Sequence, residues 1–230
     1  VYASASRRFY REGGSHAAGL FRSDEGGAPG TWRLVNPGDD SPGHPNWMAT
    51  CADLGQGNYD NLVAVDPTDP ERVWVGGTSL YRSTDGGATL TNAQYYWNGF
   101  WNQLPRDVAP VAHFDMHSLT FHPSYDGVTN TRSFVTNDGG VYEILNDRAN
   151  IPVNPDDPLG CNLLVPQSSL TADDLLFRSL NHGMGTIQFY AGAVSDDGSV
   201  LIGGAQDNAS FLAVDDMAPA LLDRGELGRF

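Results

Sequence analysis

The stretch "LVAVDPTDPERVWVGGTSLYRSTDGGATL", residues 62–90, contains three short apolar segments separated by turn residues. The first, Leu62 to Val65, ends in a turn rich in Asp and Pro, and the second runs from Val73 to Val75. Gly76-Gly77 then leads into the third, Leu80 to Arg82. Turn signals at intervals of roughly 8–12 residues between short β segments indicate a sandwich, barrel or propeller and argue against an alternating α/β fold.

The same order of strand, turn, strand, Gly-Gly and strand recurs at 117–145 and at 187–214, and the N-terminus supplies the later strands of such a unit. Repeats spaced by roughly 45–70 residues are typical of propeller blades. We therefore expect an all-β propeller of four-stranded antiparallel blades, with about three and a half blades present as part of a larger ring. The approximate blades are 1–37, 54–98, 112–180 and 186–230, with a long insertion at 146–175; one short helix is possible within 168–180.

Two turns carry a family resemblance. "STDGGATL" (83–90) resembles the Asp-box, S-x-D-x-G-x-T-W, of bacterial neuraminidase repeat and sortilin-type propellers, although Leu90 stands where Trp is usual. "SDEGGAPGTW" (23–32) looks like an expanded copy, and the whole set of motifs is similar to large secreted bacterial glycosyl-hydrolase-like repeat proteins. The resemblance implies an extracellular or periplasmic location and a structural role for Ser83, Asp85, Gly87, Thr89, Ser23, Asp24 and Trp32. Because turn Asp residues are normally satisfied by local N–H groups, Asp85 and Asp24 are poor catalytic candidates.

The formal net charge is −15, and all 13 basic residues are arginine. Such a surface repels phosphate backbones and anionic lipid, so nucleic acid is not an expected partner, whereas a divalent cation such as Ca²⁺ is electrostatically favoured. No run approaches the roughly 18 apolar residues of a membrane span. The start of the chain, "VYASASRRFY", does not have the pattern of a signal peptide. Cys51 and Cys161 permit one disulfide but do not require it.

Antiparallel order within each blade places two kinds of connection on one face: those between blades, and those between the second and third strands. The motifs at 55–60, 113–117, 136–140 and 204–210 all lie on such connections. We expect this face, near the channel, to gather the side chains of His113, Asp115, His117, Asp138, Gln206, Asp207 and Asn208.

The row His113, Asp115 and His117 would leave one face of a strand, because strand side chains alternate with period two. Three interpretations stay open. The three side chains could cap loop backbone groups, or His113, Asp115 and His117 could bind a metal ion. Alternatively, a pair drawn from Asp115, Asp138 and Asp207 could serve as acid and base, since glycoside hydrolysis needs two carboxyls roughly 5–10 Å apart.

Residues 94–104 are dense in aromatic side chains, among them Trp97 and Trp101, which could stack on sugar rings or a protein partner or could cover the sheet edge. The expected function is a non-catalytic binding or scaffold unit for a protein partner or a polysaccharide, alone or within a larger assembly. The alternative is part of an Asp-box glycoside hydrolase. A sialidase is disfavoured, because Arg7, Arg8 and Arg11 do not match the arginine cluster it would need.

Overall fold

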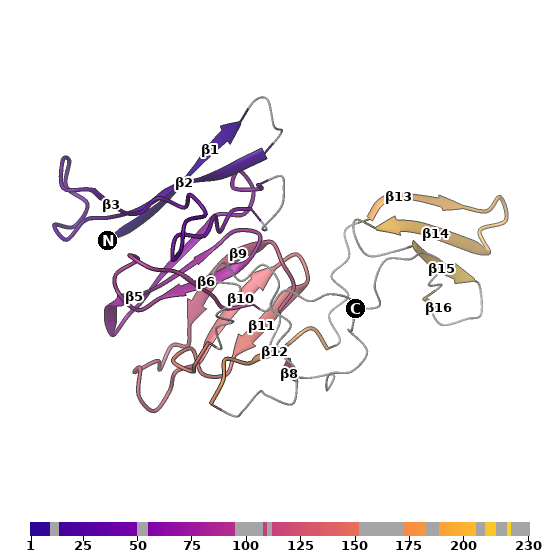
Figure 1. The fold of residues 1–230 in the computed structure, drawn as a ribbon. Helices are drawn as coiled ribbons and strands as arrows, with labels where there is room; N and C mark the ends of the chain where they lie inside the picture. Colours follow the sequence, from indigo (N-terminus) through magenta and orange to yellow (C-terminus); the bar gives the residue numbers. More distant parts are fainter. Residues whose placement is uncertain are drawn as a thin grey trace. The chain divides into compact units, whose positions relative to one another are not determined.

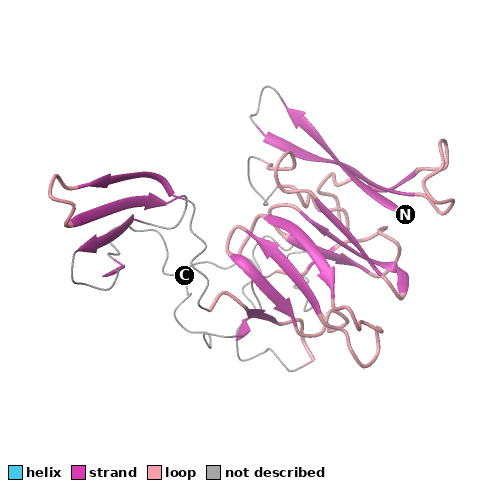
Figure 2. Ribbon diagram, turned by 180° about the vertical axis from the view of Figure 1, so that it is seen from behind, coloured by secondary structure: helices cyan, strands magenta, loops and turns pink. Residues whose placement is uncertain are grey.

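The computed structural model describes residues 1–9, 14–49, 55–94, 108–109, 112–151, 173–182, 189–205, 210–214 and 220–221. The described residues form antiparallel β-sheets and contain no helix, which confirms the all-β prediction (Figure 1; Figure 2). The chain divides into two compact units, Val1–His182 and Gly183–Phe230.

The first unit contains three sheets and the second contains one. The first sheet has the order β1 (Tyr2–Phe9), β2 (Gly14–Arg22), β3 (Arg33–Asn36). The second has the order β4 (Leu62–Asp66), β5 (Asp69–Gly76), β6 (Leu80–Ser83), β7 (Thr91–Asn92). These strands confirm the three segments expected within residues 62–83.

The third sheet has five strands where four were expected. Its order is β8 (Val108–Ala109), β12 (Phe177–Ser179), β11 (Gly140–Ile144), β10 (Ser133–Asn137), β9 (Met116–Phe121). The extra strand β8 precedes β9 in sequence but pairs with β12 at the far edge. Residues 177–179 are a strand, so the possible helix within 168–180 is wrong at that end, because pairing with β11 supplies the backbone hydrogen bonds that a helix would make internally.

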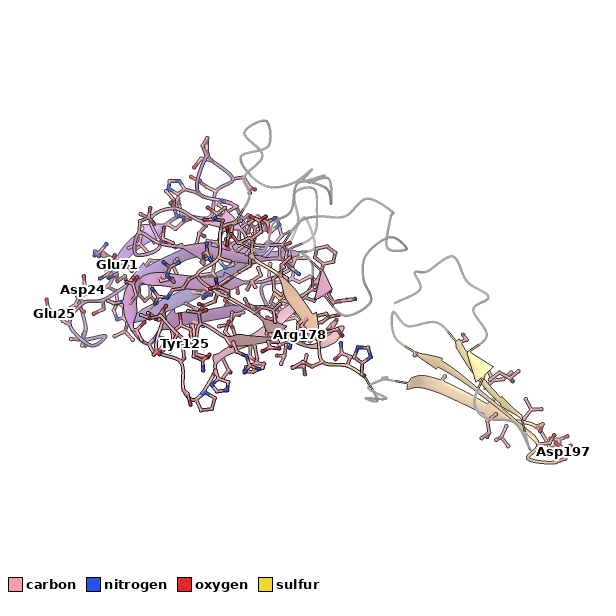
Figure 3. All side chains as sticks on the ribbon, turned by 90° about the horizontal axis from the view of Figure 1, so that it is seen from below. Asp24, Glu25, Glu71, Tyr125, Arg178 and Asp197 are labelled. Carbon is pink, nitrogen blue, oxygen red and sulfur yellow. The ribbon has the colours of Figure 1, made fainter. Side chains whose placement is uncertain are left out.

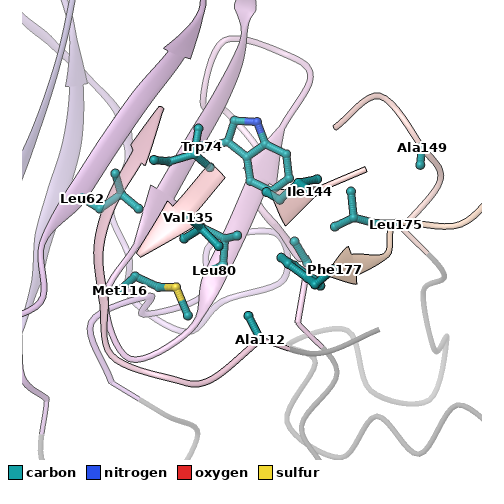
Figure 4. Close-up of a cluster of buried hydrophobic side chains, with 12 residues drawn as sticks. Leu62, Trp74, Leu80, Ala112, Met116, Val135, Ile144, Ala149, Leu175 and Phe177 are labelled. Atoms are coloured by element: carbon teal, nitrogen blue, oxygen red, sulfur yellow. The ribbon is translucent and has the colours of Figure 1, made fainter. Parts of the chain in front are cut away.

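Both faces of the second sheet are buried. Successive residues Val73, Trp74 and Val75 on β5 point to opposite faces, and all three are fully buried. One face packs on the first sheet in a cluster with Ala17, Leu20, Trp47, Met48, Val73, Val75, Tyr81 and Leu90. The other face packs on the third sheet around Trp74, Leu80, Met116, Val135, Ile144 and Phe177 (Figure 4). The apolar run Val73 to Val75 on β5 is therefore explained by the position of the second sheet between the first and the third.

The strands β1, β4 and β9, each at one edge of its sheet, lie next to one another, because β4 contacts both β1 and β9. β4 begins at Leu62 and ends at Asp66, and β9 begins at Met116 and ends at Phe121. We call the end where β4 and β9 begin the rim end, and the end where they finish the turn end. A strand of five or six residues spans roughly 16–20 Å, so the two ends are well separated.

The second unit is a four-stranded antiparallel sheet of β13 (Phe189–Val194), β14 (Val200–Ala205), β15 (Ser210–Val214) and β16 (Ala220–Leu221). Its neighbouring residues Leu201 and Ile202, which point to opposite faces, are 51% and 52% exposed. Unlike the second sheet, this sheet leaves apolar side chains accessible on both faces.

Candidate functional site

Strand β9 begins one residue after Asp115, which changes the expected row of polar side chains. Asp115 has φ 64°, in the left-handed region that Asp tolerates better than most residues, and β9 starts at Met116. The interpretation that His113, Asp115 and His117 leave one strand face in a row is therefore wrong for the first two residues. They lie on the loop that leads into the strand.

The loop before β9 is fixed by close backbone contact with the turn between β5 and β6. Met116 N–H donates to the carbonyl of Gly77 (2.7 Å), and Asp115 N–H donates to the carbonyl of Thr78 (3.1 Å). A Cβ at Gly77 would lie 2.4 Å from the carbonyl oxygen of Trp47, so only glycine fits there. The Gly76-Gly77 pair thus lets three chain segments meet beneath Asp115.

The connection at 55–60 forms a tight turn at the same end. Tyr59 N–H and Asp60 N–H both donate to the carbonyl of Gln56, at 2.7 and 2.9 Å. The turn is anchored by Gly57 N–H, which donates to the carbonyl of Ser15 (2.8 Å). It places Tyr59 outward, 60% exposed, and the side chain of Asp60 inward, with none of it exposed.

The turn between β10 and β11 brings Asp138 to this end. Asn137 Nδ2 donates to the carbonyl of His113 (2.9 Å), and Gly139 N–H donates to Asn137 Oδ1 (3.0 Å). A Cβ at Gly139 would lie 2.3 Å from His113 Cβ, so glycine is required for this close approach. His113 itself lies with Nδ1 3.1 Å from the carbonyl oxygen of Phe114.

These connections assemble what we call the rim cluster: Gln56, Tyr59, Asp60, Asp115, His117 and Asp138. His117 lies at its centre, because its Nε2 is 2.7 Å from Asp138 Oδ1 and its Nδ1 is 3.7 Å from Asp60 Oδ1. Gln56 Nε2 donates to Asp115 Oδ1 (2.9 Å), and the Tyr59 hydroxyl approaches Asp138 Oδ1 at 3.4 Å. The Tyr59 ring stands edge-on to His117, with centroids 5.1 Å apart.

The surroundings of the rim cluster favour the protonated forms of its buried carboxyl groups and of Tyr59. Burial, and then the negative charge of the adjacent Asp115, raise the pKa of Asp60 to about 8. Burial and the charge of Asp138 also raise the pKa of Asp115, although His113 and His117 oppose that effect. The carboxylate of Asp138 is the main cause of a raised pKa at Tyr59. Burial and the neighbouring carboxyls therefore favour a protonated carboxyl at Asp60, next to Asp115.

Predicted site residues fall into two groups. The structure brings Asp115, His117 and Asp138 together, with His113 on the adjoining loop. Among the described residues, no three His, Cys, Asp or Glu side chains are arranged to hold a metal ion, including the expected set of His113, Asp115 and His117. Gln206, Asp207, Asn208, Trp97, Trp101, Cys51 and Cys161 lie outside the described residues.

Sequence reasoning placed the segment 55–60 on this face but did not select Gln56, Tyr59 or Asp60. The available signal was positional: like the segment 113–115, this one ends just before a strand at the edge of a sheet. Burial of Asp60 could not be read from the sequence, since its neighbours Tyr59 and Asn61 are both exposed.

The two Asp-box turns lie at the turn end and differ from one another. In the second box Asp85 accepts hydrogen bonds from Thr89 N–H, Thr89 Oγ1 and Ser83 Oγ. Ser83 Oγ in turn accepts from Gly87 N–H (2.8 Å).

In the first box Ser23 Oγ accepts from Gly27 N–H in the same way. Asp24, however, pairs with Arg22 and Arg33, and Arg22 also pairs with Glu71. Asp24 and Glu71 are labelled in Figure 3. Trp32 is 39% exposed.

A second acidic group, which we call the latch cluster, lies at the turn end and consists of Asp66, Thr68, Tyr125, Asp147 and Arg148. Asp66 accepts from Thr68 N–H, Thr68 Oγ1, Tyr125 Oη and Arg148 Nη2. Burial acts to raise the pKa of Asp66, but the hydrogen bonds from Tyr125 and Thr68 and the charge of Arg148 outweigh it, so the pKa lies below its usual range. The Tyr125 hydroxyl (Tyr125 is labelled in Figure 3) also lies 2.9 Å from Asp147 Oδ1, so its one hydrogen is shared between the two carboxyls, and burial raises the pKa of Asp147 to about 6.

Comparison with known proteins finds distant similarity to solved structures. No family model matches the chain, and no curated protein does. A solved structure similar to it is the GH74 enzyme of Niastella koreensis, with 17% identity and a TM-score of 0.38. The match covers 93% of this chain but 26% of that enzyme, so the chain spans about a quarter of its length. In the part of the chain that the structure describes, no helix is long and apolar enough to cross a membrane.

Proposed function

We propose that this chain is part of a β-propeller that acts as a non-catalytic binding unit for a polysaccharide, with the rim cluster as its ligand site. Two features of the first unit support the propeller: the edge strands β1, β4 and β9 of its three sheets lie side by side, and the second sheet is apolar on both faces. Stacked four-stranded sheets around a common axis have these properties.

The observation that carries the binding role is the exposed Tyr59 beside the half-exposed pair of His117 and Asp138. An aromatic side chain offers a flat apolar surface to a sugar ring, and carboxylate and amide oxygens accept hydrogen bonds from its hydroxyls. Gln56 and Asp115 supply further polar atoms at the same rim. The backbone contacts through Gly57, Gly77 and Gly139 hold these groups in place before a ligand arrives.

A location outside the cytoplasm belongs to the same proposal, and it is motivated by the resemblance of the Asp-box turns to those of secreted proteins. The charge of −15 disfavours nucleic acid. A protein partner is a less favoured ligand, because the rim cluster presents hydrogen-bond acceptors and one exposed ring in place of an extended apolar surface.

The second candidate is a glycoside hydrolase site, and the raised pKa of Asp60, about 8, favours it. Hydrolysis needs one protonated and one ionised carboxyl, and pairs whose environments separate their pKa values mark such sites. Asp60 has no exposed side-chain surface, however, so it cannot reach a substrate. Of the predicted candidates that the structure describes, Asp115 and Asp138 have side chains that are not fully buried and could reach a substrate.

Binding of the 230-residue chain to immobilised neutral, acidic and amino polysaccharides tests the proposal. We expect retention on at least one polysaccharide, no release of reducing sugar, and at least a tenfold weaker affinity for Tyr59→Ala. Trp32→Ala, which removes an exposed aromatic side chain at the turn end, is the matched control and should bind as the parent does.

Two outcomes count against the proposal. Release of reducing sugar that disappears in Asp138→Asn would establish the hydrolase alternative instead. Equal loss of binding in Tyr59→Ala and Trp32→Ala would show that the ligand lies elsewhere.

A further inference from the structure

Within the described residues, the carboxyl groups of the rim cluster outnumber the cationic side chains that pair with them. The cluster contains three carboxyl groups, and their only ion-pair partner in the described part of the chain is His117. Asp115 is bonded by the neutral amide of Gln56. At the turn end, by contrast, Asp66 is paired with Arg148. An uncompensated acidic group of this kind gains most from a cation that arrives with the ligand.

Asp60 provides an independent sign that a partner is missing. Its side chain is wholly buried, and neither carboxyl oxygen accepts a hydrogen bond from an N–H or O–H group of the described residues, so the neighbouring carboxyl of Asp115 is the group to which a protonated Asp60 can donate. The 3.7 Å separation from His117 Nδ1 is longer than a hydrogen bond. Buried polar groups without partners are rare in native proteins and call for an explanation such as a proton, an ion or a ligand. This group lies directly behind Asp115 and beside His117.

We propose that the ligand recognised by the rim cluster is an amino sugar, whose primary ammonium group lies between Asp115 and Asp138 with the negative charge of Asp60 behind it. This inference rests on the proposed carbohydrate-binding function and specifies its substrate class. The exposed ring of Tyr59 is available to the sugar face and to the cation.

The shape of the site favours an ammonium group over other cations. An ammonium has three donors that diverge, so it can serve carboxylates on different loops, whereas a guanidinium binds best to one carboxylate through two parallel hydrogen bonds. Here the carboxyls come from three separate connections, at residues 60, 115 and 138. A metal ion is disfavoured, because no three of the described acidic or imidazole side chains are arranged as ligands.

Binding of a cation should be linked to proton movement. The groups that face Asp60 and Asp115 are Asp138, His113 and His117, with Tyr59 beside Asp138. A positive charge between the carboxylates favours the ionised form of Asp60 and expels its proton. Proton release is therefore a readout of this inference that simple carbohydrate binding does not produce.

Calorimetric titration of the 230-residue chain with three β-1,4-linked hexasaccharides, of glucose, N-acetylglucosamine and glucosamine, tests the inference. Near neutral pH we expect the glucosamine hexamer to bind at least about tenfold more tightly than the other two. Titrations in buffers of different ionisation enthalpy should show more proton release for the parent than for Asp60→Asn, which keeps the shape of the side chain. Asp147→Asn, a buried Asp of the latch cluster, is the matched control and should behave as the parent does.

The outcomes separate the two proposals. Equal affinity for all three hexamers overturns the amino-sugar inference and leaves carbohydrate binding standing. No binding of any hexamer, with binding of a lysine-rich peptide instead, overturns both. Tighter binding of the glucosamine hexamer with the same proton release in the parent and in Asp60→Asn overturns the assigned place of the ammonium group.

Discussion

The rim cluster and the latch cluster lie at opposite ends of the same strands, and both are built around a buried aspartate. Asp60 precedes β4 and Asp66 ends it. Asp66 receives hydrogen bonds from Thr68, Tyr125 and Arg148, whereas Asp60 receives none. A buried carboxylate is stable only when hydrogen bonds or ion pairs compensate its charge. The hydrogen bonds to Asp66 therefore account for the latch cluster as a structural feature, whereas Asp60 in the rim cluster has no such compensation. Burial of an aspartate is thus no sign of a binding site, whereas a buried carboxyl that accepts no hydrogen bond does point to one.

The largest expected effect is a loss of stability when Asp66 of the latch cluster is replaced. Asp66→Ala leaves the partly buried guanidinium of Arg148 without its ion-pair partner and removes one of the two carboxylates next to the Tyr125 hydroxyl, and it should lower the free energy of unfolding by about 3–5 kcal/mol. Asp69→Ala in the same turn, where the side chain is 37% exposed, should cost less than about 1 kcal/mol. Denaturant unfolding of both variants measures the difference in stability. Equal losses would show that the hydrogen bonds of Asp66 do not stabilise the turn end.

Removal of the Asp60 charge at the rim end should raise stability, in contrast to removal of Asp66 at the turn end. The folded pKa of Asp60, about 8, lies above the ordinary value of an unfolded Asp, about 4, so this group costs stability progressively as pH rises from about 4 to about 8. Asp60→Asn should therefore be more stable than the parent by about 1–2 kcal/mol at pH 8 and equal to it near pH 4. Urea unfolding across this pH range measures the gain, and a destabilised variant at pH 8 contradicts it.

The Asp-box turn sharpens the comparison, because its polar groups are satisfied locally. Ser83→Ala removes the oxygen that accepts from Gly87 N–H and donates to Asp85, and should cost about 1 kcal/mol. Since Ser83 lies at the turn end, thermal unfolding should show the loss while ligand binding stays unchanged. A change in binding would mean that the two ends are coupled.

The smallest expected effect concerns the exposed surface of the rim. Tyr59→Phe removes a hydroxyl 3.4 Å from Asp138 on an exposed ring, so stability should change by less than about 0.5 kcal/mol. The ring remains, so binding should weaken much less than in Tyr59→Ala. A stability loss as large as that of Asp66→Ala would show that the rim cluster, like the latch cluster, stabilises the fold.

Much of the architecture follows from the sequence because its signals are local. The apolar segments and glycine-rich turns of residues 62–83 predicted three strands that the structure contains, and antiparallel order predicted that 55–60, 113–117 and 136–140 share one end. The fifth strand β8 escaped prediction, because two residues paired with a segment about 70 positions away leave no local pattern.

The sequence by itself determined the strand pattern, the acidic surface and which connections meet at the rim, since alternation and turn chemistry act between neighbours in the chain. Only the tertiary structure decided that Asp60 is buried and accepts no hydrogen bond from the described residues, that Asp115 lies outside the strand, and that Asp66 is paired with Arg148. Each of these depends on contacts between residues distant in sequence, and burial and pairing set the energy of a carboxylate more strongly than its neighbours along the chain do.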